Sequence, residues 1–213
     1  MASLTGKVAR IAVTAAAPTS STDNAAVLST DGVTLPITST GKRHWPNNTT
    51  SLVVAVGGTA TTDAYTVNYV EGVVTFSTPH STASTYTIDV ETLTASFVGE
   101  GRDWSLRTDV DMRDHTAFST GSTDTQWRTV KPGLAGGTVT INRFWGETTG
   151  PAFFDRLAAN QDTIVELWTD HATRNKLEAF AWVSEDGFDV PLDGDAAEAI
   201  TLTVNDQIYM STA

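Results

Sequence analysis

Three features of the 213-residue chain predict a mainly β fold. Apolar and polar residues alternate over short segments such as Tyr65–Asn68 and Leu106–Met112, and a period of two is typical of half-buried strands. Glycine-containing dipeptides separate many of these segments, as tight turns require. Helical periodicity is confined to one stretch of about three turns. We therefore expect an antiparallel β-sandwich or barrel with one short α-helix.

The first 96 residues are expected to form an N-terminal, immunoglobulin-like β-module. Its clearest element is a hairpin over residues 64–76, in which Glu71-Gly72 supplies a two-residue turn. Further strands are predicted at residues 8–13, 51–56 and 85–93, and residues 15–22 are predicted to be a loop because they are rich in alanine, serine and threonine around a proline. Residues 4–15 belong either to this module or to the sheet of the second half.

Residues 97–213 are expected to form the second unit. Its first strand places Trp104, Leu106 and Val110 on one face, and Arg107, Asp109 and Asp111 on the other. Pro132-Gly133 and Gly136-Gly137 predict a turn, after which a second strand begins at residue 138. Three later strands are predicted at residues 163–169, 176–184 and 199–204. The first two have apolar residues on both faces, so both faces are expected to be covered.

The single helix is predicted at about residues 151–160. Gly150-Pro151 provides a start signal, since proline is favoured at the first helical position. Phe153, Phe154 and Leu157 then lie on one helical face. We expect these three side chains to pack the helix onto the sheet.

Composition excludes several classes of function. The formal net charge is -12, with 13 Lys and Arg residues against 25 Asp and Glu residues, which disfavours binding to nucleic acid or to an anionic membrane. The chain contains no cysteine, so disulfides and thiolate zinc sites are impossible. It also has no apolar run long enough to span a membrane and no signal-peptide core at its start.

No catalytic, cofactor-binding or metal-binding residues are predicted, and we expect a protein that is not an enzyme. The histidines at positions 44, 80, 115 and 171 are far apart and are expected at the surface or in loops. Asp109, Asp111 and Asp114 lack the glycine and terminal glutamate of a calcium loop. Asp193-Gly194-Asp195 is interpreted as a turn. No nucleophile elbow or phosphate-binding loop is present.

One segment resembles a known family. After the acidic strand around residue 109, the chain runs Trp127-Arg128, Pro132-Gly133-Leu134 and Gly136-Gly137, and closes on Phe144-Trp145. This arrangement is similar to the major tail tube proteins of long-tailed, siphovirus-like bacteriophages, and the similarity extends over residues 99–213. It implies a β-sandwich or barrel of the tail tube type and a structural virion protein located in the tail, assembled in the host cytoplasm.

The resemblance also implies partners. Copies of the chain would form hexameric rings that stack into a hollow tube along a tape-measure protein, with tail terminator or tail-tip proteins at its ends. Double-stranded DNA would pass through without specific binding, which suits an acidic wall because carboxylates repel phosphate. Asp109, Asp111, Glu166 and Glu178 are the candidate channel-lining residues.

Two alternatives remain open from the sequence. The threonine-rich strands and six tryptophans also suit a carbohydrate-binding or adhesive β-sandwich, although packing in a core or an interface explains the tryptophans more simply. A hydrolase on a sandwich fold is the other alternative, because paired carboxylates need not be close in sequence.

Overall fold

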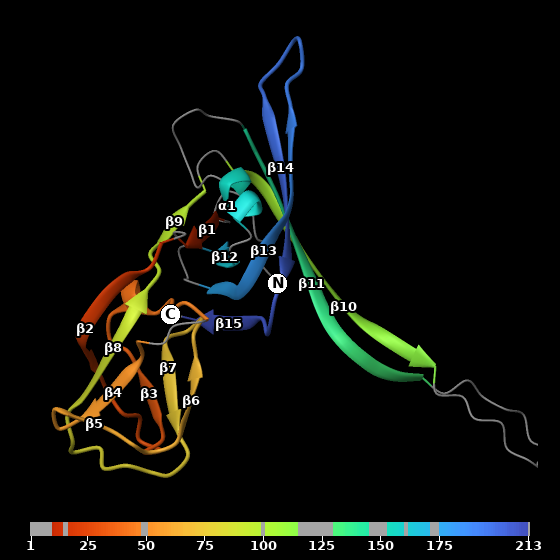
Figure 1. Cartoon of the computed structure of the whole chain (residues 1–213). Coiled ribbons are helices and arrows are strands. Elements are labelled where there is room, and N and C mark those ends of the chain that lie inside the picture. The colour runs from red at the N-terminus through yellow and green to blue at the C-terminus, as the bar shows by residue number, and fades with distance from the viewer. Residues whose placement is uncertain are drawn as a thin grey trace, which may run out of the picture.

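Antiparallel β-sheet dominates the molecule (Figure 1). The computed structural model describes residues 10–14, 17–47, 51–98, 101–114, 130–144, 153–159, 162–170 and 175–212. Strands account for 63% of the structure, and the single described α-helix has seven residues. The predicted mainly β class is thereby confirmed.

The strands of the N-terminal half are β2 (Thr19–Ala26), β3 (Thr34–Pro36), β4 (Val53–Val56), β5 (Thr59–Ala60), β6 (Tyr65–Asn68), β7 (Val73–Phe76) and β8 (Tyr86–Thr92). A short 3-10 helix, η1, covers Thr40–Lys42. The other strands are β1 (Arg10–Thr14), β9 (Ala95–Phe97), β10 (Gly101–Asp114), β11 (Val130–Phe144), β12 (Asp162–Asp170), β13 (Asn175–Asp189), β14 (Ala197–Val204) and β15 (Tyr209–Thr212). Helix α1 is Phe153–Ala159.

The largest sheet has eight strands in the order β10-β11-β14-β13-β12-β1-β9, with β15 pairing on β13. Strand β1 lies between β12 and β9, so residues 10–14 are part of this sheet and not of the N-terminal module. All its pairings are antiparallel. Among the described strands, β10 and β9 end this order and β15 pairs with β13 alone, so these three strands have an edge at which the sheet can be extended.

The core of the large sheet is apolar and is covered by helix α1. Val139, Ile141, Ile200 and Leu202 are buried there, and the Phe153 side chain of the helix is 1% exposed in the same cluster. Leu157 packs against the cluster from the edge. The side chain of Phe154 and the residues before Phe153, including Gly150-Pro151, lie outside the described residues. The helix itself forms where the sequence predicts it.

The N-terminal module encloses a second core between a four-stranded sheet, β2-β8-β4-β5, and a three-stranded sheet, β3-β7-β6. Strand β8 alternates buried and half-buried residues along its length, as its sequence predicts. The β6–β7 hairpin also forms, but the predicted two-residue turn at Glu71-Gly72 was wrong, because Asn68 pairs with Val73 and the connection is the four residues 69–72. Its turn glycine, Gly72, has a φ of +65°, and a Cβ placed there would lie 2.5 Å from the carbonyl oxygen of Arg43. Glycine is therefore required by both conformation and space.

Two further sequence expectations about the strands were wrong. Residues 19–22, predicted as loop, begin strand β2, because cross-strand hydrogen bonds to β8 hold a polar segment that has little strand propensity of its own. The predicted turn at Pro132-Gly133 and Gly136-Gly137 is instead part of β11. Pro132 is tolerated because β14 pairs with β11 only from Thr138 onward, which leaves one side of the preceding segment without a partner strand.

Two hairpins project from opposite ends of the large sheet (Figure 1). The first, here called the ribbon, is the distal part of β10 and β11, residues 107–114 and 130–137. The second, here called the tip, is the end of β13 and β14 with the connection between them, residues 184–198. Phe144 at the far end of β11 pairs with Ala197 at the base of the tip, so the ribbon and the tip extend in opposite directions. Among the described residues, no helix has the length and apolar character needed to span a bilayer.

Candidate functional site

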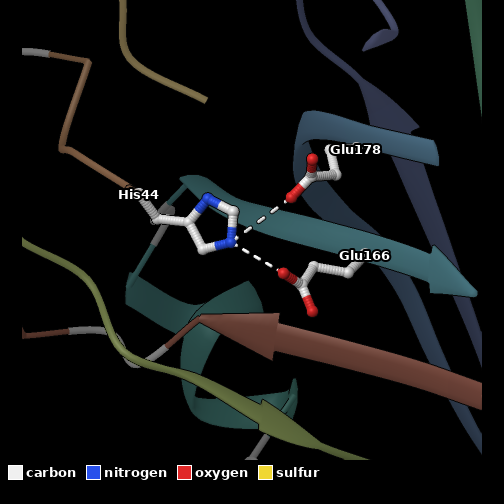
Figure 2. A group of neighbouring side chains, drawn as sticks. All are labelled: His44, Glu166 and Glu178. Carbon is white, nitrogen blue, oxygen red and sulfur yellow. Dashed lines mark hydrogen bonds and ion pairs between the residues drawn. The ribbon is translucent and has the colours of Figure 1, made fainter. Parts of the chain in front are cut away.

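A buried cluster of charged residues joins the N-terminal module to the large sheet (Figure 2). Glu166 on β12 and Glu178 on β13 are direct cross-strand partners. His44 reaches them from the segment after η1, with its Nε2 atom 2.8 Å from Glu166 Oε1 and 3.5 Å from Glu178 Oε1. All three residues are at most 6% exposed. The cluster therefore lies inside the contact between the two halves.

Lys176 balances the two carboxylates. Like charges directly opposite each other on neighbouring strands are destabilising. Lys176 is two residues before Glu178 on β13, so both side chains point to the same face. Its Nζ atom lies 2.6 Å from Glu166 Oε1 and 2.5 Å from Glu178 Oε1. The ammonium group thus pairs with both carboxylates at once.

Both ring nitrogens of His44 have a hydrogen-bond partner. The Nδ1 atom lies 2.7 Å from the carbonyl oxygen of Val70, and the Nε2 atom lies 2.8 Å from Glu166 Oε1. Burial alone would raise the pKa of Glu166, but hydrogen bonds from His44 and Lys176 outweigh it and lower that pKa to about 2. Glu166 is therefore ionised near neutral pH and accepts these hydrogen bonds.

The residue types in the cluster match a metal site, since the ligand atoms of His44, Glu166 and Glu178 lie within 4.8 Å of one another. The position between the carboxylates, however, is taken by the Lys176 ammonium group. A divalent ion would have to displace this internal cation. We therefore assign the cluster as an ion-pair network that fixes the two halves of the chain together.

An apolar contact surrounds the ion pairs. Val70 and Leu93 of the N-terminal half pack against Ile164 and Phe180 of the large sheet, and each is at most 6% exposed. The backbone N–H of Leu93 also donates to the carbonyl oxygen of His44 at 2.7 Å. These contacts hold the imidazole in place and exclude water from the carboxylates.

The structure separates the four predicted channel-lining residues into two pairs. Asp109 and Asp111 are exposed on the ribbon. Glu166 and Glu178 are buried and paired with His44 and Lys176, so they present no charge to a channel. The prediction was wrong for this second pair. Strands β12 and β13 are covered on both faces, so the glutamates on these strands are buried together with their apolar neighbours.

His44 is the site residue that the sequence interpretation missed. It was expected at the surface or in a loop, and it lies in a loop but is only 6% exposed. It is 122 residues away from Glu166 in the sequence, so no local spacing relates the two. The one sequence signal was on the other side of the contact, where Lys176 and Glu178 share a strand face that is otherwise apolar.

A second buried group of charges lies beneath helix α1. Arg143 of β11 pairs with Glu198 of β14, and its guanidinium group also stacks on the ring of Phe153 at 5.2 Å. Asp186 of β13 is close by. Burial and the charge of Glu198 raise the pKa of Asp186 to about 6. Glu198 is 1% exposed, so it is not available to a substrate or to a calcium ion at the Asp193-Gly194-Asp195 turn.

The surfaces available for association are the sheet edges and the two projecting hairpins. In the described part of the chain β10 pairs with β11 alone, which leaves a 14-residue strand with one open side. Val110, Met112 and Leu134 on the ribbon are 48%, 59% and 76% exposed. Val190 and Leu192 at the tip are 76% and 100% exposed. Large apolar side chains this exposed, at two projecting ends, mark contact surfaces.

Comparisons with known proteins give distant structural likeness without a sequence match. Neither a family model nor a curated protein sequence matches the chain. Among solved structures, it is similar to a chain described as the tail of an empty GTA particle, computed with helical refinement and C6 symmetry. The two are 10% identical, with a TM-score of 0.43, and the match covers 56% of this chain and 87% of the other.

Proposed function

We propose that the protein is a structural virion protein that self-assembles into stacked hexameric rings, forming the hollow tail tube of a long-tailed bacteriophage. The role is mechanical and needs neither a catalytic residue nor a cofactor. The ring of six copies and the siphovirus-like tail come from the sequence resemblance over residues 99–213. The surfaces that would support assembly come from the chain's own geometry.

The observation that carries the proposal is the open edge of the large sheet. Strand β10 presents up to 14 residues of backbone on its outer side, and an exposed edge of this length pairs readily with another strand. The opposite edge is formed by β9, a strand of three residues that covers only part of β1. A neighbouring copy that adds its β9 edge to β10 would continue the sheet from subunit to subunit and close it into a ring.

The charge of the chain suits a conduit for DNA. Each copy has a formal net charge of -12, so an assembled wall would repel phosphate instead of holding it. Within this proposal, Asp109 and Asp111 remain the residues assigned to the channel, since both are exposed on the ribbon. Double-stranded DNA would then pass without specific contacts.

The remaining partners follow from the same proposal. A tape-measure protein would occupy the tube during assembly, and terminator and tip proteins would close its two ends. Their binding surfaces would be the same hairpins and edges that join successive copies, because the last copy at each end presents them unpaired. The protein would assemble in the host cytoplasm and remain in the virion tail.

Electron microscopy of the purified, concentrated chain tests the proposal. The expected result is rings or tubes with a central channel, accompanied by sedimentation that depends on protein concentration. A chain that stays monomeric at every concentration and salt condition would contradict the proposal.

A carbohydrate-binding module is the second candidate, and a hollow on the large sheet favours it. The hollow has a volume of about 500 Å³ and lies over the ends of β10, β11, β13 and β14. It is lined by Arg102, Asp103, Asn142, Gly187, Phe188 and Ala199, among others. Amide, carboxylate and guanidinium groups beside an aromatic ring are suited to sugar hydroxyls. Binding on a glycan array that is lost in Asn142→Ala would support this candidate over the tube.

A further inference from the structure

We propose that Asp193 is a site of spontaneous covalent modification, at which the aspartate isomerises to isoaspartate. The chain has three Asp-Gly dipeptides, which begin at Asp31, Asp186 and Asp193. Glycine after the aspartate favours the reaction, because the missing Cβ leaves the backbone nitrogen accessible and the backbone free to turn. All three dipeptides are therefore candidates from the sequence, and their surroundings distinguish them. The inference concerns the chemistry of a single copy and does not rest on the proposed function.

The reaction requires a neutral carboxyl group that can reach the next backbone nitrogen. At Asp193, the nitrogen of Gly194 attacks Cγ, an N–C bond forms, and the amide hydrogen and the carboxyl OH leave together as water. A second water molecule then opens the resulting succinimide at the carbonyl that belonged to the main chain. The main chain afterwards runs through the side chain of residue 193 and is longer by one methylene group, while the mass is unchanged.

The carboxylate of Asp31 is held in a form that does not react. It accepts hydrogen bonds from the hydroxyl group of Ser29 and from the backbone N–H groups of Val33 and Thr34, the last two at 2.9 and 3.1 Å. These hydrogen bonds lower the pKa of Asp31 well below its usual range, so the group stays ionised. The Gly32 nitrogen donates to the carbonyl oxygen of Ser29 at 3.0 Å. Both reacting groups of this dipeptide are therefore occupied.

Asp186 is favoured by protonation but not by geometry. Its pKa is raised to about 6 by burial and by Glu198, so protonation alone would make it the most reactive of the three. Asp186 and Gly187 lie within β13, however, and pair with Ile200 and Ala199 of β14. Closing the ring requires the backbone to rotate out of the extended conformation, which this pairing prevents. The strand must first open locally, and the cost of opening slows the reaction.

Asp193 meets no such obstacle. It lies in the connection between β13 and β14, at the end of the projecting tip (Figure 1). Asp193 and Gly194 are both exposed, and neither forms a hydrogen bond with another residue in the described part of the chain. Gly194 has a φ of +144°, a conformation that residues with a side chain rarely adopt. The carboxyl group can therefore approach the Gly194 nitrogen without any local unfolding.

Prolonged incubation of the full-length chain tests the inference. The protein is kept for several weeks at mildly acidic pH and physiological temperature, at a concentration where light scattering shows a monomer. Peptide mapping with electron-transfer fragmentation then distinguishes isoaspartate from aspartate at equal mass. We expect isoaspartate to form at Asp193 at least about tenfold faster than at Asp31 or Asp186, the ratio that about 1.4 kcal/mol of local opening alone would produce.

Two matched variants and a denatured sample complete the test. Asp193→Glu should remove the signal, because its longer side chain closes the corresponding larger ring far more slowly. Asp195→Glu, at an exposed position in the same connection that is followed by alanine, should leave the signal unchanged. Circular dichroism verifies that both variants fold. In guanidinium chloride the three dipeptides should react at similar rates. Similar rates in the folded chain, an excess at Asp193 that persists in the denaturant, or a signal that survives Asp193→Glu would each overturn the inference.

Discussion

Among individual residues, Glu166 shows how a buried charge is made tolerable. Its carboxylate accepts hydrogen bonds from His44, from Lys176 and from the indole N–H of Trp168 at 3.0 Å. Removing water from a carboxylate costs several kcal/mol, and only this number of donors offsets that cost. The result is a carboxyl group whose pKa lies at about 2 despite its burial.

The lowered pKa of Glu166 predicts acid sensitivity. The folded state binds fewer protons than the unfolded state, so the stabilisation is fully present above about pH 4.5 and is lost as the pH falls toward 2. We expect the melting temperature of wild type to fall across this window. Glu166→Gln should melt lower at pH 7 and lose less on acidification, as measured by scanning calorimetry. The exposed residue Glu185 supplies the control, since Glu185→Gln should leave the profile unchanged.

Asp186 predicts the opposite behaviour. Its pKa is raised to about 6, so the folded state binds more protons and stability declines as the pH rises from about 4 to 6. Asp186→Asn should therefore be more stable than wild type at pH 7.5, by about 1 kcal/mol after allowing for solvent screening of this partly buried residue. At pH 4 the two proteins should unfold at similar denaturant concentrations. An equal gain from Asp189→Asn, on the exposed end of the same strand, would contradict this explanation.

At the scale of elements, the presence of the β6–β7 hairpin and of helix α1 could be predicted from sequence because their causes are local. The length of the hairpin connection could not, because it depends on which residues of the two strands pair. Strand β2 and the full length of β11 were not predictable, since pairing with β8 and β10 overrides the local preferences of serine, glycine and proline. Gly137 is an example of such a long-range cause. A Cβ at this position would lie 3.1 Å from the Val204 side chain on β14, so the tight contact comes from a strand far away in the sequence.

The turn of the β6–β7 hairpin gives a matched test of space against conformation. Gly72 and Gly57 have φ values of +65° and +61°, but only a Cβ at Gly72 meets another atom within 4 Å. Gly57→Ala should cost about 1 kcal/mol for the backbone conformation alone. Gly72→Ala should cost clearly more, because it also forces Arg43 away. Equal free energies of unfolding in urea would show that the contact is easily relieved.

Helix α1 depends on one aromatic side chain. Phe153 is 1% exposed and packs in the core of the large sheet, so Phe153→Ala should lower the free energy of unfolding by about 3 to 5 kcal/mol. Phe188, which is 47% exposed, provides the comparison, and Phe188→Ala should cost less than about 1 kcal/mol. A small effect of Phe153→Ala in chemical denaturation would show that the helix is not part of the core.

Over the described part of the molecule, a small apolar contact and an ion-pair network join the two halves. The sequence predicted an N-terminal module and a second unit, and it left open which of the two contains residues 4–15. It did not reveal the contact between the halves, because His44 and its partners are separated by more than a hundred residues. Long-range partners of this kind are determined by how the two cores pack, and no local pattern records them.

This joint predicts how the molecule unfolds. With the network intact, both halves should unfold in one transition. Lys176→Met leaves two buried carboxylates facing each other and should destabilise the joint by about 3 to 5 kcal/mol, separating the calorimetric trace into two transitions. Lys131→Met, at an exposed position on the ribbon, should leave a single transition. One unshifted transition in Lys176→Met would show that the halves are held by the apolar contact alone.

The long open side of β10 also has a consequence for newly made chains. The unpaired backbone groups of this edge offer a template for amyloid-like stacking. Charged side chains at alternate positions, Arg107, Asp109 and Asp111, and the irregular register between Val110 and Met112 oppose such flat, in-register growth. Replacing these charges with threonine should therefore lower the solubility of the newly made chain.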